Sequence, residues 1–310
     1  NRSSRLGLAF TKACLSTTSV SALIPTIVRH NDQHLICEKD IDQISKITTG
    51  INQTWNEYFD NLDNNTKTLL QFSSIPDNGI HLVNAIKSKE AIGVTDCSVK
   101  INSKTSAISW IITDANRSFV CEGRAGCPTF YAALDSYSGE MFGIYVMLTA
   151  VKVISQFHNV KKGHLVIACD NDSSLSISLD SYKRAKPTDA YYDLIWAIQE
   201  LRKDVNFTVK AKNVAGHQEK KKKKLNIYEK LNVEMDKKAK EFRRLLEKGK
   251  VQHIPNIVSR TNWKVKLGNL YICYNMEQSL RDHVQGTELI NHMIRKQILT
   301  RPAVKHIDWD

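Results

Sequence analysis

The stretch HLVIACDN, from His164 to Asn171, is a continuous apolar run that ends abruptly in a carboxylate and an amide. A run of this kind is typical of a parallel strand that is buried on both faces. It follows a long amphipathic pattern over residues 138–157, which predicts a helix. Because reactive groups gather at the carboxyl ends of strands in open sheets, Asp170 is a candidate functional residue.

The segments on either side extend this pattern into an α/β fold. Upstream, short runs rich in Ile, Val, Ser and Thr are separated by turn residues and predict three antiparallel strands, at 91–98, 105–113 and 118–122. Downstream, the pattern predicts a helix, a strand and a last helix, at 192–203, 206–214 and 233–247. We therefore expect a mixed five-stranded sheet flanked by helices.

Two extensions flank this predicted domain of residues 89–250. Residues 1–88 contain apolar residues at three- or four-residue steps between positions 41 and 58, which predict a helix. A Pro and Asn-Gly turn at 73–79 is a candidate boundary. Residues 251–310 show fewer signals, with one or two short helices expected at 277–298. No function is predicted for either extension.

The composition indicates which classes of protein and of binding partner are compatible with this chain. With 310 residues, 42% apolar and 25% charged, the chain is typical of globular proteins, and wholesale disorder is excluded. A formal charge of +12 favours an anionic partner. No membrane span is expected, because the longest apolar stretch, 142–154, is interrupted by Lys152 and is shorter than the roughly 20 residues required. The 7 cysteines include no Cys-x-x-Cys pair, which favours a reducing intracellular compartment, nucleus or cytoplasm.

Four carboxylates fall at positions where they can converge. Asp96 closes the first strand of the sheet, and Asp170 closes the fourth. Glu140 lies on the apolar stripe of its helix, where an unpaired charge is costly, and Asp236 lies beside the apolar stripe of the last helix. Oxygen ligands without Cys or clustered His select Mg²⁺, or Mn²⁺, over zinc. Paired ions held in this way are used for in-line attack at phosphodiesters.

The order of these motifs resembles a type 1 ribonuclease H domain. The motifs are Thr95-Asp96-x-Ser98, Ser138-Gly139-Glu140, Asp170-Asn171, Gly216-His217-Gln218 and Met235-Asp236-x-x-Ala239. The resemblance covers about residues 89–250, and the flanking segments are most similar to the ribonuclease H region of a retroelement reverse transcriptase polyprotein. The polymerase signature Tyr-x-Asp-Asp is absent, since 191–194 reads Tyr-Tyr-Asp-Leu.

This resemblance implies a metal-dependent endoribonuclease that cleaves the RNA strand of RNA–DNA hybrids. It implies that Asp96, Glu140, Asp170 and Asp236 bind two Mg²⁺ ions and that His217 assists proton transfer or product release. The nucleic-acid contacts are expected from Ser98, Asn171 and the lysines Lys220, Lys221, Lys222, Lys223 and Lys224. Residues 210–250 hold 15 basic and 6 acidic residues, which agrees with phosphate contacts.

One departure from the family leaves a second function open. Cys97 occupies the position after the first Asp, where the family usually has Gly, and a side chain there is expected to crowd the approach of nucleic acid or metal. This departure favours the alternative of a catalytically inactive nucleic-acid-binding module of a degenerate retroelement. A third alternative keeps the fold and changes the reaction to strand transfer or DNA cleavage at a related acidic site.

Each motif also has a purely structural interpretation. An Asp at a strand end often forms a turn. The negative charge of Asp236 would stabilise the N-terminus of a helix, with Asn232 as the N-cap. The lysine tract would be a solvated surface or a nuclear-targeting signal.

Overall fold

The computed structural model describes residues 26–30, 33–38, 53–128, 135–186, 189, 191–216, 224–254, 264–267, 270–272, 276–298 and 300. Contacts divide the chain into two units, each formed by two segments. The smaller unit comprises Asn1–Ile44 and Ser259–Ile272, and the larger comprises Ser45–Val258 and Cys273–Asp310.

The larger unit contains a six-stranded mixed sheet with the strand order β3-β6-β5-β4-β7-β8. β3, β6, β5 and β4 pair antiparallel, whereas β4, β7 and β8 run parallel. The strand bounds are β3 Ser73–Ser74, β4 Ala91–Lys100, β5 Thr105–Thr113, β6 Cys121–Gly126, β7 His164–Cys169 and β8 Thr208–Asn213.

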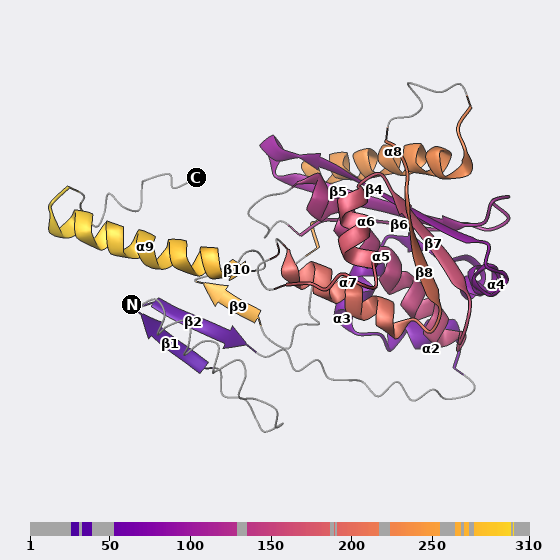
Figure 1. Ribbon diagram of the computed structural model, residues 1–310, viewed down its shortest axis with the longest axis horizontal. Helices are drawn as coiled ribbons and strands as arrows, with labels where there is room; N and C mark the ends of the chain where they lie inside the picture. Colours follow the sequence, from indigo (N-terminus) through magenta and orange to yellow (C-terminus); the bar gives the residue numbers. More distant parts are fainter. Residues whose placement is uncertain are drawn as a thin grey trace. The chain divides into compact units, whose positions relative to one another are not determined.

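Helices cover both faces of this sheet (Figure 1). α8 packs on β4, β5 and β6 on one face, and α5 packs on β4 and β5 on the other, with α6 and α7 beside it. The helix bounds are α2 Trp55–Asp60, α3 Asn64–Leu70, α4 Ile80–Ser88, α5 Ser136–Phe157, α6 Asp172–Leu179, α7 Tyr192–Asp204, α8 Ile227–Glu247 and α9 Met276–Arg295, with short 3-10 helices at Pro76–Gly79 and Ile101–Ser103.

The smaller unit joins the two ends of the chain in one antiparallel sheet. Its strands are β1 Thr26–His30, β2 Gln33–Glu38, β9 Lys264–Leu267 and β10 Leu270–Ile272, in the order β1-β2-β9-β10. The central pair, β2 with β9, links segments that are more than 220 residues apart in sequence. Such a pairing requires that the chain between them fold back on itself.

The mixed sheet flanked by helices agrees with the sequence prediction, and the differences have local causes. The sheet has a sixth strand, β3, whose 2 residues are too few to form a periodic pattern. α4 and α6, of 9 and 8 residues, were not predicted. α8 begins at Ile227 rather than Val233, because Asn226 and Glu229 form a capping box. α9 is one helix of 20 residues, and the sequence suggested one or two short ones. Of the helix predicted at 41–58, residues 41–52 lie outside the described residues.

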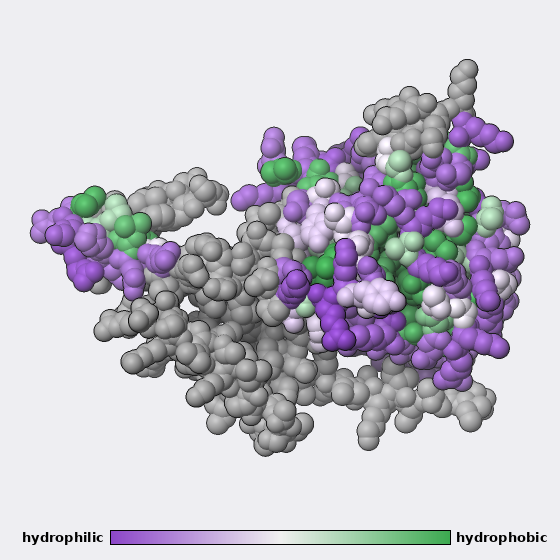
Figure 2. Space-filling view, viewed as in Figure 1, coloured by the Kyte–Doolittle hydropathy of each residue, from purple (hydrophilic) through white to green (hydrophobic). Residues whose placement is uncertain are grey.

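α5 is apolar all round because it is a core helix. Among the described residues it is the one helix long and apolar enough to cross a membrane by length and composition, and 83% of that window is buried inside the protein. The face in Figure 2 shows hydrophilic side chains over most of the described surface. Burial between the sheet and neighbouring helices accounts for the composition of α5.

Candidate metal centre

The register of β4 and β7 brings the first two carboxylates together. Val94 pairs with Ala168 in the parallel ladder. Asp96 and Asp170 each lie two residues further along, so both reach the same end of the sheet. Glu140 on α5 completes the group, and one carboxylate oxygen of each of the three residues lies within 4.8 Å of the others. The structure therefore brings three of the four predicted ligands together.

Glu140 is held at this position by its backbone surroundings. The α5 N-terminus is capped by Asp135, whose carboxylate accepts a hydrogen bond of 2.7 Å from the Ser138 N–H. Tyr191 donates from its hydroxyl to the other oxygen of Asp135 at 3.0 Å. Glu140 lies one turn into the helix, and its Oε1 accepts a hydrogen bond of 2.9 Å from the Cys97 N–H of β4. Sheet and helix thus fix this carboxylate together.

The second oxygen of Glu140 is the clearest indication that the cluster holds a cation. Glu140 is 2% exposed and its Oε2 has no hydrogen-bond partner among the described residues. Asp96 is 6% exposed, so two carboxyl groups are buried side by side. Buried charges are normally paired or coordinate metals. The arrangement therefore fits a hard divalent cation, which would satisfy the orphaned oxygen and offset the mutual repulsion.

The same surroundings shift the pKa values of both carboxyls upward. Burial raises the pKa of Asp96 well above its usual range, and the charges of Glu140, Asp170 and Asp236 raise it further. Burial also raises the pKa of Glu140 to about 8, with a further contribution from Asp170, and the hydrogen bond from Cys97 opposes the shift. Both shifts show that full ionisation of the cluster needs a counter-charge.

The Cys97 side chain lies on the α5 side of β4, beside the carboxylate of Glu140. A methyl group at residue 139 would lie 2.7 Å from Cys97 Sγ, so the thiol packs against Gly139 of α5. Its Sγ also contacts the Ser136 carbonyl oxygen at 3.5 Å, and burial together with the charge of Glu140 raises the pKa of the thiol. The side chain at residue 97 therefore fits against α5 because residue 139 is glycine.

Asp236 lies near the cluster, but its carboxylate interacts with a residue outside it. Its carboxylate forms an ion pair with Lys240, one turn later on α8, at 2.6 Å. Because α8 begins nine residues earlier, Asp236 is not in the first turn of the helix. Asn232 is not a cap either: it is buried, and its Nδ2 donates to Asp96 Oδ2 at 3.2 Å. The structural interpretation of these two residues is therefore wrong in both parts.

The predicted nucleic-acid contacts have structural partners where they are described. The Oδ1 of Asn171 caps α6 by accepting from the Ser174 N–H at 3.0 Å. Ser98 is buried, and its hydroxyl accepts a hydrogen bond of 2.9 Å from Arg243 Nε. Arg243 was not predicted, although it lies seven residues, two helical turns, after Asp236 on the same side of α8. That spacing was the signal that would have identified it.

The loop after β8 approaches Asp170 at its third residue, Gly216. A methyl group on Gly216 would lie 2.5 Å from Asp170 Oδ2, so a larger residue here would require this carboxylate to shift. His217 follows immediately in sequence, but it lies outside the described residues, as do Lys220, Lys221, Lys222 and Lys223. Lys224 is described and is exposed.

Known structures with a similar fold are ribonuclease H domains. No model of a known protein family matches the sequence, and no curated protein matches it. The N-terminal RNase H domain of a Mycobacterium tuberculosis protein is 13% identical, with a TM-score of 0.34, over 49% of this chain and 96% of that one. LC11-RNase H1, isolated from compost, is 14% identical, with a TM-score of 0.37, over 50% and 96%. The same enzyme in complex with an RNA/DNA hybrid is 15% identical, with a TM-score of 0.34, over 48% and 99%.

Proposed function

We propose that this protein is a divalent-metal-dependent nuclease of the ribonuclease H type that cleaves the RNA strand of RNA–DNA hybrids. The observation that carries the proposal is the convergence of Asp96, Glu140 and Asp170 from two parallel strands and a helix, with one buried oxygen left unpartnered. Carboxylate sets of this kind hold Mg²⁺ or Mn²⁺ for phosphodiester hydrolysis.

The chain's own residues prepare the site for this chemistry. Bound Mg²⁺ would activate water and stabilise the leaving oxygen. Asn232 fixes the orientation of Asp96 through its amide N–H, and the Cys97 N–H fixes Glu140. Asp170, beneath the Gly216 backbone, is partly exposed and faces the loop that leads to His217. In this proposal His217 assists proton transfer or product release.

Recognition of the substrate rests on charge and on the 2′-hydroxyl. Residues 210–250 carry most of the net positive charge, and Lys210 and Lys212 are exposed on the edge strand β8. Cationic residues beside the acidic cluster would bind phosphates. Discrimination between the strands would use RNA 2′-hydroxyls in the minor groove. The origin in a retroelement polyprotein belongs to the same proposal and rests on the sequence motifs alone.

One observation favours a second candidate, a module that binds hybrids without cleaving them. The Asp236 carboxylate is paired with Lys240, and a site that binds a second cation through Asp236 must break that pair. If the pair persists, the second cation is held weakly, and binding would survive while cleavage is lost.

A cleavage assay distinguishes the two candidates. A hybrid labelled on the RNA strand is incubated with the full chain and Mg²⁺ or Mn²⁺, beside the variants Asp170→Asn and Asp172→Asn. Asp172 is exposed in the first turn of α6, two residues from the cluster, and provides the matched control. The nuclease proposal expects cleavage by the wild type and by Asp172→Asn, with loss in Asp170→Asn and in EDTA. Binding without cleavage by all three proteins selects the second candidate.

A further inference from the structure

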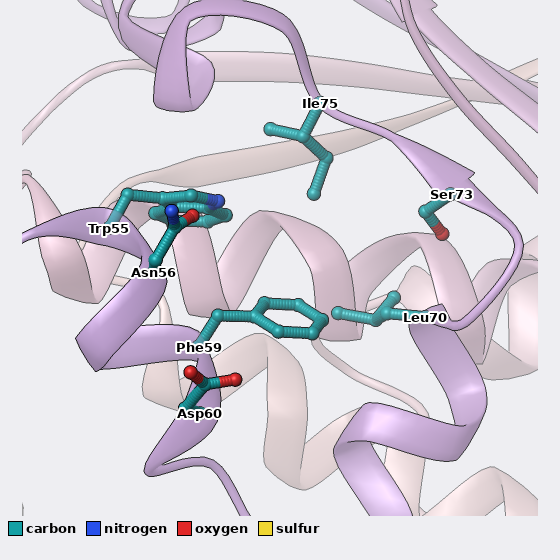
Figure 3. Close-up of a pocket in the computed structure, with 7 residues that line it drawn as sticks. All are labelled: Trp55, Asn56, Phe59, Asp60, Leu70, Ser73 and Ile75. Atoms are coloured by element: carbon teal, nitrogen blue, oxygen red, sulfur yellow. The ribbon is translucent and has the colours of Figure 1, made fainter.

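A pocket of about 390 Å³ lies on the larger unit, between α2, α3 and β3. Figure 3 shows its lining side chains, which are Trp55, Asn56, Phe59, Asp60, Leu70, Ser73 and Ile75. It adjoins Phe157 at the last turn of α5, whereas Glu140 lies near the first turn. At 1.5 Å per residue these two positions are about 25 Å apart, so the pocket is separate from the acidic cluster.

Two aromatic rings form one side of the pocket and are held in place by a third. The Trp55 ring packs edge-on against Phe157 with 5.1 Å between the ring centroids. The Phe59 ring lies 6.1 Å from that of Trp55. Leu70 and Ile75 line the pocket from α3 and from the segment after β3 (Figure 3). The walls therefore combine two aromatic rings with the aliphatic side chains of Leu70 and Ile75.

The charged group in the lining of the pocket is the Asp60 carboxylate. No described residue pairs with the Asp60 carboxylate, since Lys67 Nζ bonds to the Asp60 backbone oxygen, at 2.8 Å. The Ser73 Oγ is buried without a hydrogen-bond partner among the described residues. Asn56 contributes an amide oxygen beside Trp55. An anionic ligand such as a phosphate would be repelled here, and a cation would be attracted.

We propose that this pocket binds an arginine side chain from a basic segment of a protein partner. A guanidinium group is planar and stacks on aromatic rings, as an ammonium group cannot. It carries five N–H donors and no acceptor, which matches the carboxylate of Asp60 and the amide oxygen of Asn56. The volume lies within the range of ligand sites.

Short blocked peptides test this proposal directly. The peptide Gly-Ser-Arg-Ser-Gly is titrated into the full chain at low salt by calorimetry, beside peptides with lysine or citrulline at the central position. Citrulline keeps the planar shape and lacks the charge. The arginine peptide is expected to bind about fivefold more tightly than the lysine peptide and at least ~10-fold more tightly than the citrulline peptide.

Variants assign the binding to this pocket. Asp60→Asn and Phe59→Leu are each expected to weaken binding of the arginine peptide about fivefold. Glu241→Gln, an exposed carboxylate of α8 outside the lining, is the matched control and leaves the affinity unchanged. Thermal unfolding checks that each variant folds. If Phe59→Leu fails to fold, Asp60→Asn decides the result.

Three results would overturn the proposal. These are no saturable binding of the arginine peptide, equal binding of the citrulline peptide, and displacement of the arginine peptide by an RNA oligonucleotide, which would make the pocket a nucleic-acid site. The test is independent of the nuclease proposal, because neither the peptides nor the variants involve Asp96, Glu140 or Asp170.

Discussion

The buried carboxylates of the acidic cluster, Asp96 and Glu140, differ from Asp236 in the contacts that hold them. Asp96 and Glu140 are almost fully buried and are fixed by hydrogen bonds from Asn232 and from the Cys97 backbone. The Asp236 side chain is 24% exposed and is paired with Lys240 on its own helix. Burial removes Asp96 and Glu140 from water and leaves them in need of a cation, whereas Asp236 is already paired with Lys240. Proximity in space therefore does not make four acids equivalent ligands.

The largest effect on the rate of hybrid cleavage is expected from substitution of the acidic residues. Asp96→Asn, Glu140→Gln and Asp170→Asn should each lower the rate of hybrid cleavage by at least ~10³-fold, since each removes a ligand that the fold cannot replace. Asp236→Asn should lower the cleavage rate by about 10–100-fold, because the Asp236 carboxylate is paired with Lys240 and binds the metal less firmly. Single-turnover cleavage rates in Mg²⁺ measure both. Equal losses for all four variants would show that Asp236 binds as firmly as the others.

Asn232 should have an intermediate effect on the same rate. Asn232→Leu removes the amide that orients Asp96 and should weaken the affinity for Mg²⁺ by about 10–100-fold. The measurement is the metal concentration required for half-maximal cleavage, which should rise by this factor. Asn232→Asp keeps the shape but adds a like charge beside Asp96, and should be at least as damaging. If the leucine variant has the wild-type metal requirement, the hydrogen bond to Asp96 is not what orients the site.

Packing between β4 and α5 can be tested by a reciprocal pair of variants. Gly139→Ala places a methyl group 2.7 Å from Cys97 Sγ and should lower the free energy of unfolding by ~1–3 kcal/mol. In the double variant Cys97→Gly with Gly139→Ala the space is available again, so most of this loss should be recovered. Denaturant titrations of the two single variants and the double variant measure the coupling. Purely additive losses would show that the two side chains do not compete for space.

The sequence predicted those parts of the fold and site that follow from strand patterns. β7 was predicted with its exact bounds, and Asp96 and Asp170 were predicted to be adjacent, although Asp96 lies within β4, which continues to Lys100, and not at its end. The contact made by Asn232 was not predicted, because it depends on where α8 begins. That start is set by the capping box at Asn226, which the apolar periodicity does not reveal.

Aromatic residues of the N-terminal segment illustrate the same limit. Trp55 and Tyr58 were predicted to lie on the buried face of a helix, and Tyr58 is indeed buried. The pocket, however, requires that Trp55 and Phe59 of α2 meet Ser73 and Ile75, which belong to β3 and the turn after it. Such a meeting depends on the tertiary path of the chain, and no local pattern encodes it.

The pH dependence of stability caused by Asp193 is the smallest effect expected. It separates the influence of burial on a carboxyl pKa from that of repulsion between carboxylates. Asp193 lies in the first turn of α7, and burial alone raises its pKa to about 7. Because the folded state holds this proton more tightly than the unfolded state, the contribution of Asp193 to stability is greatest below pH ~4 and is lost as pH rises through 7, on the order of 2 kcal/mol after allowance for partial exposure.

Asp193→Asn should flatten this part of the pH profile without any dependence on Mg²⁺. Thermal midpoints of the wild type and the variant, measured from pH 4 to 8 with and without the ion, provide the comparison. A decrease in stability that persists in Asp193→Asn and disappears only when Mg²⁺ is added would assign the pH dependence to the acidic cluster instead. Burial of a single carboxyl would then be the weaker of the two effects in this protein.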